Sequence, residues 1–182
     1  GKDITVGPES VGAAPGPACF GLGGKRATIT DVFLLLGVLD PTTYFGGEFS
    51  LDAERARGAI TANIAEPLGL SLNEALIRMS NAWVDKIALA LKSYSDIDDQ
   101  TTLAGFGGAG ALAATRIADA TGARRVIIPG LGAVFSAVGI GFSPLSQVYQ
   151  FTLDENSDEA LHRVVCSTRA RAQKDMFAEG VD

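Results

Sequence analysis

The glycine cluster in residues 101–129, TTLAGFGGAGALAATRIADATGARRVIIP, is the segment whose residue types and spacing could do chemistry. Gly105, Gly107 and Gly110 stand at G-x-G-x-x-G spacing, after a strand-like run and before a helix-like run. Backbone N–H groups at such a turn can face a phosphate or a sugar, and glycine leaves free the space that a Cβ would fill. No bulky side chain stands between Phe106 and Leu112, which favours close approach of a nucleotide. The alternative is that the glycines only let strand and helix pack closely.

The residues near the glycines of this sequence argue against two common nucleotide-binding motifs, the dinucleotide fingerprint and the P-loop. A dinucleotide fold needs an acidic residue about 20 positions on, at the end of the second strand. That strand ends in VIIPGLG without a carboxylate, and Asp119 comes too early, within the expected helix. In the segment GGKRAT, Lys25 is followed by Arg26 where a phosphate-binding P-loop needs Ser or Thr. Neither a dinucleotide fingerprint nor a P-loop is therefore predicted.

Metal and nucleophile motifs find little support in the sequence. His162 is the only histidine, and neither C-x-x-C nor G-x-S-x-G occurs. We expect His162 on the surface of the last helix. Cys19 has no nearby histidine or other base, so we expect a buried structural thiol. With Cys166 as the only other cysteine, the chain fits a reducing compartment, although one bridge between the two is left open.

Composition excludes several classes of partner. The 182 residues carry a formal net charge of -6 and no block of Lys and Arg, which argues against nucleic acid as a partner. The uncharged run 126–142 contains Pro129 and several glycines, and it is shorter than the roughly 20 residues of a membrane-spanning helix. A soluble, cytoplasmic protein without a membrane partner is predicted. The abrupt start, GKDITVGPES, suggests a piece of a larger protein.

The first third of the chain is expected to contain loops, a short strand and two helices. Ile4–Val6 is expected to form the strand, within a loop region rich in Gly and Pro. A short buried helix is predicted from Thr30 or Asp31 to Asp40-Pro41. Ser50 can cap the next helix, which places Asp52 and Glu54 in the first turn; Pro67 and Gly69 are expected to end it.

The residues after Ser71 predict a long amphipathic helix. Ser71 and Glu74 have the spacing of a capping box, in which each side chain binds the other residue's backbone N–H. Apolar residues then recur at steps of three and four. We expect this stripe, Trp83 included, to face the core rather than a cofactor; its members are Leu72, Ala75, Leu76, Met79, Ala82, Trp83, Ile87, Ala90 and Leu91.

The glycine cluster lies inside a predicted strand–helix–strand unit. Residues 101–106 and 124–129 are expected to be buried strands, and residues 111–121 a helix that ends at Gly122. Beyond it, the pattern predicts a helix over 132–142, a strand over 147–153 and a final amphipathic helix over 158–180. The expected organisation is one domain in three segments: 1–50, a strand-loop segment with a short helix; 51–150, a helical part with the nucleotide-binding βαβ lobe; and 151–182, a strand and a C-terminal helix.

Three stretches resemble the hydantoinase A/oxoprolinase family and occur in that family's order. They are VGPESVGAAPGPACFGLGG, TITDVFLLLGVLDPTTYFGG and AGFGGAGALAATRIADATGARRVIIP, and the resemblance covers most of residues 3–150. The family includes ATP-dependent enzymes that hydrolyse hydantoins and oxoproline, and the related large subunits of acetone and acetophenone carboxylases. The first stretch is long and unusual, which makes the resemblance specific at the level of the family.

The resemblance implies an α/β fold, part of an ATPase lobe like those of actin, heat-shock chaperones and sugar kinases, with a mixed sheet and flanking helices. It implies ATP and a divalent cation, Mg²⁺ or Mn²⁺, as cofactors. Asp31 is the candidate catalytic carboxylate; it could orient a metal-bound water or cap the helix that follows, and both readings are kept. The residues matched to the nucleotide-binding turn are Gly105, Gly107, Gly108, Ala109 and Gly110.

The implied function is ATP-dependent activation of a cyclic amide carbonyl by phosphorylation, followed by ring-opening hydrolysis of this small-molecule substrate. One alternative is a subunit of an ATP-dependent acetone or acetophenone carboxylase; another is a non-catalytic scaffold in a heteromer. The implied partner is a large subunit of the hydantoinase B type. The sequence departs from the family at SPLSQVY, where Pro144 and Gln147 replace an expected Asp and His. The phosphate-binding turns of the first lobe are absent, so the isolated segment is expected to be inactive.

Overall fold

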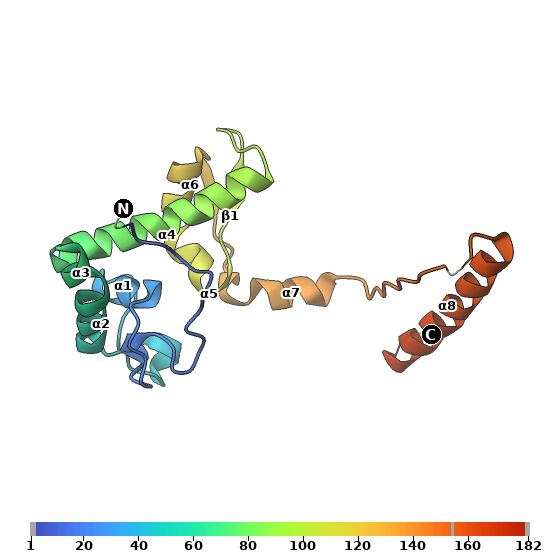
Figure 1. Ribbon diagram of the computed structural model, residues 1–182, viewed down its shortest axis with the longest axis horizontal. Helices are drawn as coiled ribbons and strands as arrows, with labels where there is room; N and C mark the ends of the chain where they lie inside the picture. Colours follow the sequence, from blue (N-terminus) through green and yellow to red (C-terminus); the bar gives the residue numbers. More distant parts are fainter. Residues whose placement is uncertain (1–2, 154, 181–182) are drawn as a thin grey trace. The chain divides into compact units, whose positions relative to one another are not determined.

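The computed structural model describes residues 3–153 and 155–180 (Figure 1). These residues form two compact units, Gly1–Val138 and Gly139–Asp182, and each is described by itself. The boundary falls inside a helix, α7 (Phe135–Phe142). The candidate nucleotide-binding glycines and Asp31 all belong to the first unit.

The N-terminal part of the first unit is built from loops and short helices. Residues 4–6 form no strand, contrary to the prediction, because no described segment pairs with them. A 3-10 turn, η1 (Ala18–Phe20), precedes helix α1 (Ile29–Leu35). The helix ends five residues earlier than predicted, because Gly37 adopts a left-handed conformation with φ of 72° just after its C-cap.

Helix α2 (Ala53–Ile60) begins after a second short turn, η2 (Tyr44–Gly47). Its cap is Asp52, whose carboxylate accepts the backbone N–H of Arg55 at 3.0 Å; the predicted cap, Ser50, makes no such bond. The helical path continues through a π-helical turn, η3 (Thr61–Ala65), into α3 (Glu66–Leu68) and ends at Gly69, as predicted. The wide turn directly precedes Pro67, whose ring would clash with a carbonyl of the preceding turn in a regular α-helix.

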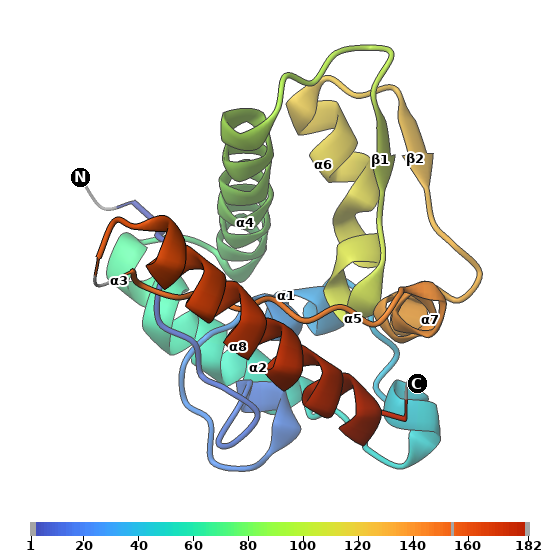
Figure 2. The same ribbon diagram turned by 90° about the vertical axis from the view of Figure 1, so that its right-hand side faces the viewer.

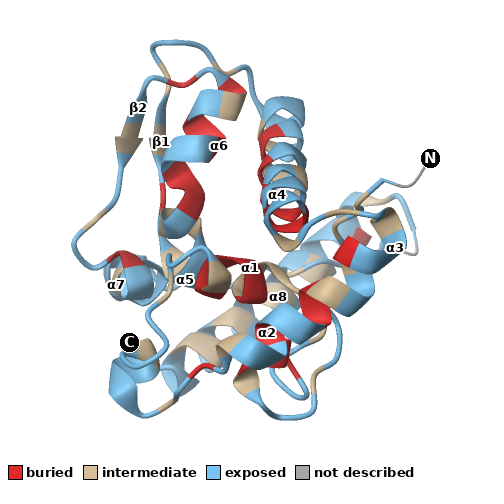
Figure 3. Ribbon diagram, turned by 90° about the vertical axis from the view of Figure 1, so that its left-hand side faces the viewer, coloured by how far each residue is buried: buried red, intermediate tan, exposed pale blue. Residues whose placement is uncertain are grey.

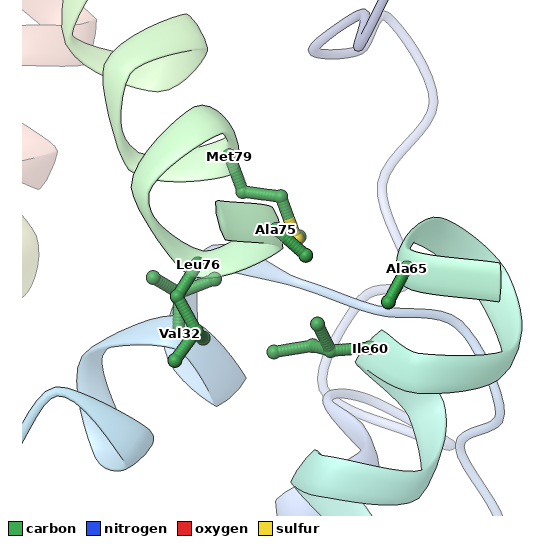
Figure 4. Packing of buried hydrophobic residues seen from close by; sticks show 6 residues of the cluster. All are labelled: Val32, Ile60, Ala65, Ala75, Leu76 and Met79. Carbon is green, nitrogen blue, oxygen red and sulfur yellow. The ribbon is translucent and has the colours of Figure 1, made fainter. Parts of the chain in front are cut away.

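Helix α4 (Leu72–Tyr94) is the longest helix of the first unit and packs against several of its other helices. Its predicted capping box is confirmed. The Ser71 hydroxyl accepts the N–H of Glu74, and the Glu74 carboxylate accepts the N–H of Ser71 at 2.8 Å. One face of α4 packs against α1 and α6 (Figure 3). Figure 4 shows how α4 closes one part of the core with α1 and the α2–η3 segment; the cluster consists of Val32, Ile60, Ala65, Ala75, Leu76 and Met79.

The predicted strand–helix–strand unit is confirmed. Strands β1 (Thr102–Ala104) and β2 (Arg125–Ile127) pair in parallel, with Leu103 opposite Val126. Figure 2 shows the two strands side by side, with α6 (Ala114–Thr121) next to them. As predicted, α6 ends at Gly122, which takes the left-handed conformation with φ of 92°. Among the described residues the sheet is purely parallel, not mixed, and both strands are partly exposed rather than buried.

The remaining elements carry fewer tertiary contacts. A 3-10 turn, η5 (Gly132–Val134), leads into α7, so the helix expected over 132–142 is present. Residues 147–153 form no strand, contrary to the prediction, because no described partner strand lies beside them. Helix α8 (Asp158–Ala178) is present, and its Asp175 accepts a hydrogen bond of 2.7 Å from the Tyr149 hydroxyl. His162 is exposed on α8, as predicted.

Candidate functional site

The glycine cluster forms a sharp corner between β1 and the helices that follow. Gly105 continues the strand ladder, because its N–H donates to the Ile127 carbonyl at 2.9 Å. Phe106 is extended and Gly107 turns the chain with a φ of +80°, a conformation that favours glycine. The one-turn helix α5 (Gly107–Gly110) and a 3-10 turn, η4 (Ala111–Ala113), then lead into α6. The corner thus brings the predicted nucleotide-binding residues together in one short segment.

The glycines of this corner differ in the atoms that surround them. A Cβ on Gly105 would lie 2.9 Å from the Cβ of Ala114, so this glycine is required for close packing of strand and helix. A Cβ on Gly107, Gly108 or Gly110 would meet nothing within 4 Å. Packing therefore accounts for Gly105 and leaves the other three facing open space. The packing interpretation thus applies to Gly105, whereas close approach of a ligand to the other three glycines stays a prediction.

A cavity of about 240 Å³ opens beside the corner. Its lining is apolar and comes from β1, the corner, α6 and one face of α4. The Phe106 ring lies at its edge and contacts the Phe135 ring, with 5.3 Å between ring centroids. We call this space the corner cavity; it is lined by Ile87, Leu91, Leu103, Ala104, Gly105, Phe106, Gly110, Ala114 and Ile117. Of the three glycines that face open space, Gly110 lines this cavity, whereas Gly107 and Gly108 are not part of its lining.

Asp31 is fully buried and its carboxylate is engaged by three donors. One oxygen accepts the backbone N–H of Cys19 at 2.8 Å. The other accepts the backbone N–H of Thr28 at 2.9 Å and the Thr28 hydroxyl at 2.7 Å. Thr28 in turn accepts the Asp31 N–H, which completes a capping box at the start of α1. Of the two roles considered for Asp31, helix capping is the one that these contacts perform; a direct catalytic role stays a prediction.

Cys19 is fully buried beside Asp31, as expected for a structural thiol. Burial, followed by repulsion from the Asp31 carboxylate, raises the pKa of the Cys19 thiol to about 12. The nucleophilic thiolate is therefore scarce at neutral pH. Both cysteines are free, and Cys166 is exposed on α8.

These properties predict that Cys19 resists thiol reagents in the folded protein while Cys166 reacts. Mass spectrometry after treatment with a chromogenic disulfide reagent should find Cys166 modified, and Cys19 modified only after denaturation. Because the folded-state pKa is raised above 9.0, Cys19 contributes stability that is complete below pH 9 and is lost as the pH rises towards 12. Rapid modification of Cys19 under native conditions would contradict this description.

A second hollow, which the sequence did not predict as a site, lies at the N-terminal side of the same unit. It has a volume of about 440 Å³ and is enclosed by the loop 4–12, the segment 26–30 and α4. We call it the N-terminal cavity. The Arg26 guanidinium on its wall donates to the Glu9 carboxylate at 2.9 Å, and the Lys86 ammonium donates to the Val6 carbonyl. The available sequence signal was the Gly- and Pro-rich loop itself, since such a loop can carry binding residues.

Comparison with known protein families gives a match over most of the chain. The hydantoinase/oxoprolinase family model matches residues 1–149. The chain belongs to the hydantoinase/oxoprolinase family. The predicted resemblance is therefore confirmed, and it covers both the glycine corner and the N-terminal cavity.

Individual relatives of this hydantoinase/oxoprolinase chain include carboxylase and amide-hydrolysing proteins. The acetophenone carboxylase gamma subunit of Aromatoleum aromaticum is 30% identical over 202 residues, which cover 100% of this chain and 27% of that protein. The caprolactamase subunit alpha of Pseudomonas jessenii is 32% identical over 189 residues, or 97% of this chain and 27% of that protein.

A solved structure confirms the fold relationship. The crystal structure of the ATP-dependent caprolactamase from Pseudomonas jessenii superposes with a TM-score of 0.68 at 29% identity, over 96% of this chain and 27% of the matched chain. The chain thus spans about a quarter of the length of the relatives it matches. It is a hydantoinase/oxoprolinase segment of α/β fold with a small parallel sheet.

Residues 3–153 and 155–180 of this family member contain neither a metal-binding cluster nor a membrane-spanning helix. No three side chains of His, Cys, Asp or Glu gather there in a way that could hold a metal ion. The helices of the same part of the chain are each too short or too polar to cross a membrane.

Proposed function

We propose that the protein carrying this chain uses ATP to activate the carbonyl group of a cyclic amide for ring-opening hydrolysis. The observation that carries the proposal is the bare corner at Gly107, Gly108 and Gly110, where a Cβ would meet only open space. This corner occurs in a family member whose relatives include a caprolactamase described as ATP-dependent. A scaffold protein would have no need for backbone that is free of side chains beside an open cavity.

The chemistry explains why ATP is needed. An amide carbonyl is a poor electrophile and its nitrogen a poor leaving group, so ring opening is slow without activation. Transfer of the γ-phosphoryl group to the carbonyl oxygen makes the carbon more reactive towards water. Overall, ATP, the cyclic amide and two water molecules give ADP, phosphate and the ring-opened amino acid. Such a reaction depends on positioning and on electrostatic stabilisation of the transferred group.

The glycine corner fits a role in holding the adenosine part of ATP. Gly107, Gly108, Ala109 and Gly110 would present backbone to it without side chains in the way. Gly105 would support the corner by allowing α6 to pack against β1. We propose Asp31 as a positioning residue, because its contacts fix the start of α1 and the loop at Cys19. ATP supplies the phosphoryl group; this segment's residues supply binding surface and shape.

A divalent cation, Mg²⁺ or Mn²⁺, is part of the proposal only for the complete protein. The described residues offer no cluster of metal ligands, and both oxygens of Asp31 are already engaged by backbone or hydroxyl donors. We therefore assign the cation to no residue of this segment. We further propose a cytoplasmic heteromer with a large subunit of the hydantoinase B type; the subunit names of the two relatives support only the assembly with other chains.

The proposal predicts that ADP release depends on a cyclic amide. The complete polypeptide, purified with the subunits that accompany it, is incubated with ATP and either caprolactam, hydantoin or 5-oxoproline. One of these amides should raise ADP formation at least tenfold over the rate without amide, with stoichiometric ring opening measured by chromatography. ATP turnover without ring opening by any of them would contradict the hydrolase proposal.

The second candidate is an ATP-dependent ketone carboxylase, favoured by the acetophenone carboxylase gamma subunit that matches the full chain at 30% identity. It predicts that acetone or acetophenone stimulates ADP formation and incorporates labelled bicarbonate into an acid-stable product. The same preparation distinguishes the two candidates. A scaffold subunit would bind no ATP in either assay.

A further inference from the structure

We propose that the N-terminal cavity binds the small carbonyl substrate whose activation was proposed above. The inference rests on that proposed function and adds a location and a chemical class for the substrate. Its ligand is an uncharged carbonyl compound with a compact apolar body, either a cyclic amide or a ketone. The argument uses the walls of the cavity, its polar groups and its relation to the corner cavity.

The walls come from segments far apart in the sequence that enclose a space of ligand size. The loop 4–12, the segment 26–30 and α4 together surround about 440 Å³. Small-molecule sites in proteins typically measure about 300 to 1,000 Å³. The backbone takes a left-handed conformation at Gly7, with φ of +66°, and at Gly12, with φ of +64°. These turns fold the loop over the cavity.

One side of the cavity is apolar and held in place by packing. Ile64, Met79 and Trp83 contribute to it. The Trp83 indole packs edge-on against Phe33, with ring centroids 5.5 Å apart and an interplanar angle of 87°. Phe33 is itself in the core, so the indole has a fixed support. An aliphatic or aromatic ring can lie against such a surface without exposing apolar area to water.

The other side offers hydrogen-bond donors. Arg26 donates from one guanidinium nitrogen to Glu9, and no further partner of this side chain occurs in residues 3–153 and 155–180. Thr30 also lines the cavity, and its hydroxyl has no hydrogen-bond partner in that described part of the chain. The Arg26 and Glu9 side chains are 62% and 76% exposed, so solvent screens the pair, and the Glu9 carboxylate beside Arg26 disfavours an anionic ligand. A carbonyl oxygen satisfies such donors without adding a buried charge.

The cavity is related to the nucleotide corner through α4. Trp83 lines the N-terminal cavity and also a neighbouring apolar groove that continues to Ile87 and Leu91. Ile87 and Leu91 in turn line the corner cavity. One face of a single helix thus borders all three spaces. A substrate in the N-terminal cavity and a nucleotide at the corner would both border α4, and this helix would hold the two binding sites at a fixed separation.

Trp83 is the only tryptophan of this chain and gives a direct test. The complete polypeptide is titrated, without ATP, with 2-piperidinone, cyclohexanone and tetrahydropyran, three six-membered rings of which the last has no carbonyl group. A saturable change in Trp83 fluorescence is expected with one or both carbonyl compounds and not with tetrahydropyran. The Trp83→Phe variant identifies the Trp83 signal, which must disappear in it. Binding of 2-piperidinone would indicate a cyclic amide as the substrate, and binding of cyclohexanone a ketone.

Thr30→Val tests the donor side. The substitution keeps the shape and removes the hydroxyl, and we expect about tenfold weaker carbonyl binding, the loss of roughly one hydrogen bond. When ADP formation is measured as above, the KM for the carbonyl substrate should rise by the same factor, and the KM for ATP should be unchanged. Thr115→Val, at an exposed threonine on α6, is the matched control and should change neither constant.

The outcomes separate this inference from the proposed function. Saturable carbonyl binding that is weakened by Thr30→Val, but without any ATP turnover, would support the cavity and contradict the proposed function. ATP-dependent turnover whose substrate KM is the same in Thr30→Val and wild type would overturn the cavity as the substrate site. A fluorescence change of equal size in Trp83→Phe and wild type, or no saturable change with either carbonyl ring, would overturn it as well.

Discussion

Replacing Gly108 by tryptophan is expected to abolish ATP-dependent turnover while the protein stays folded. A Cβ at this position meets nothing within 4 Å, so the side chain leaves the backbone without a packing conflict. It does fill the space in front of the corner, where we propose that the adenosine part of ATP lies. We expect the Kd for ATP to rise at least about 100-fold, close to 2.7 kcal/mol. Isothermal titration with a nonhydrolysable ATP analogue measures the change.

Gly58→Trp is the control for this substitution. Gly58 is an exposed glycine of α2, and a Cβ there also meets nothing within 4 Å. Both variants should unfold at similar urea concentrations, but only Gly108→Trp should lose ATP binding. Unchanged ATP affinity in a folded Gly108→Trp protein would exclude the corner as the nucleotide site. Equal losses in both variants would indicate a general effect of the added indole.

Removal of the Asp31 carboxylate is expected to have the largest effect on stability. Asp31→Ala takes the partner from the buried N–H of Cys19 and from both donors of Thr28. The loss of a helix cap and of a buried acceptor together should lower the free energy of unfolding by about 3 to 5 kcal/mol. That is a large fraction of the roughly 5 to 15 kcal/mol that stabilise a typical domain. Urea denaturation followed by circular dichroism measures it.

Asp31→Asn separates a structural role from a direct catalytic one. Asparagine keeps one acceptor oxygen, but its NH₂ group must face N–H or O–H donors that Asp31 satisfies, so intermediate destabilisation is expected. If Asp31 only positions α1 and the Cys19 loop, turnover per folded molecule should remain within about tenfold of wild type. A loss above about 1,000-fold in a variant that is still folded would instead support participation in the chemistry.

The parts of the fold that depend on local patterns could be predicted from the sequence. Ser71 and Glu74 lie three residues apart and cap a helix by contacts with each other, so the sequence contains the whole motif. Gly122 ends α6 because glycine adopts the left-handed conformation at little cost. The strand–helix–strand unit followed in the same way from periodicity and turn residues. Local chemistry was sufficient in each case.

Predictions that depended on distant partners were less successful. Residues 4–6 alternate like a strand, but a strand needs a neighbour to accept its hydrogen bonds, and no described segment provides one. Asp52 and Ser50 are both good capping residues two positions apart. Leu51 is buried in the core and the helix begins at Ala53, so the capping position falls on Asp52.

The candidate site also combines features that local sequence predicts with features that depend on residues distant in the sequence. The sequence identified the glycines at the corner, but the distinction between Gly105, which packs, and Gly107, Gly108 and Gly110, which face open space, depends on where Ala114 lies. The N-terminal cavity could not be predicted, because it joins a loop to α4 across an interval of 80 residues, as the Lys86 contact with Val6 shows. A single sequence carries no direct signal for such an encounter.

The exposed apolar character of α7 has a consequence for colloidal behaviour. Residues 126–153 contain no Asp, Glu, Lys, Arg or His, and Ile140 and Phe142 are 74% and 88% exposed. Residues 126–153 therefore lack charged gatekeeper residues, which in other proteins reduce aggregation through apolar segments. Wherever it is left uncovered, copies will associate through it. Co-expression with a companion that shields α7 should yield dispersed material, whereas raising the salt concentration should not disperse the associated protein.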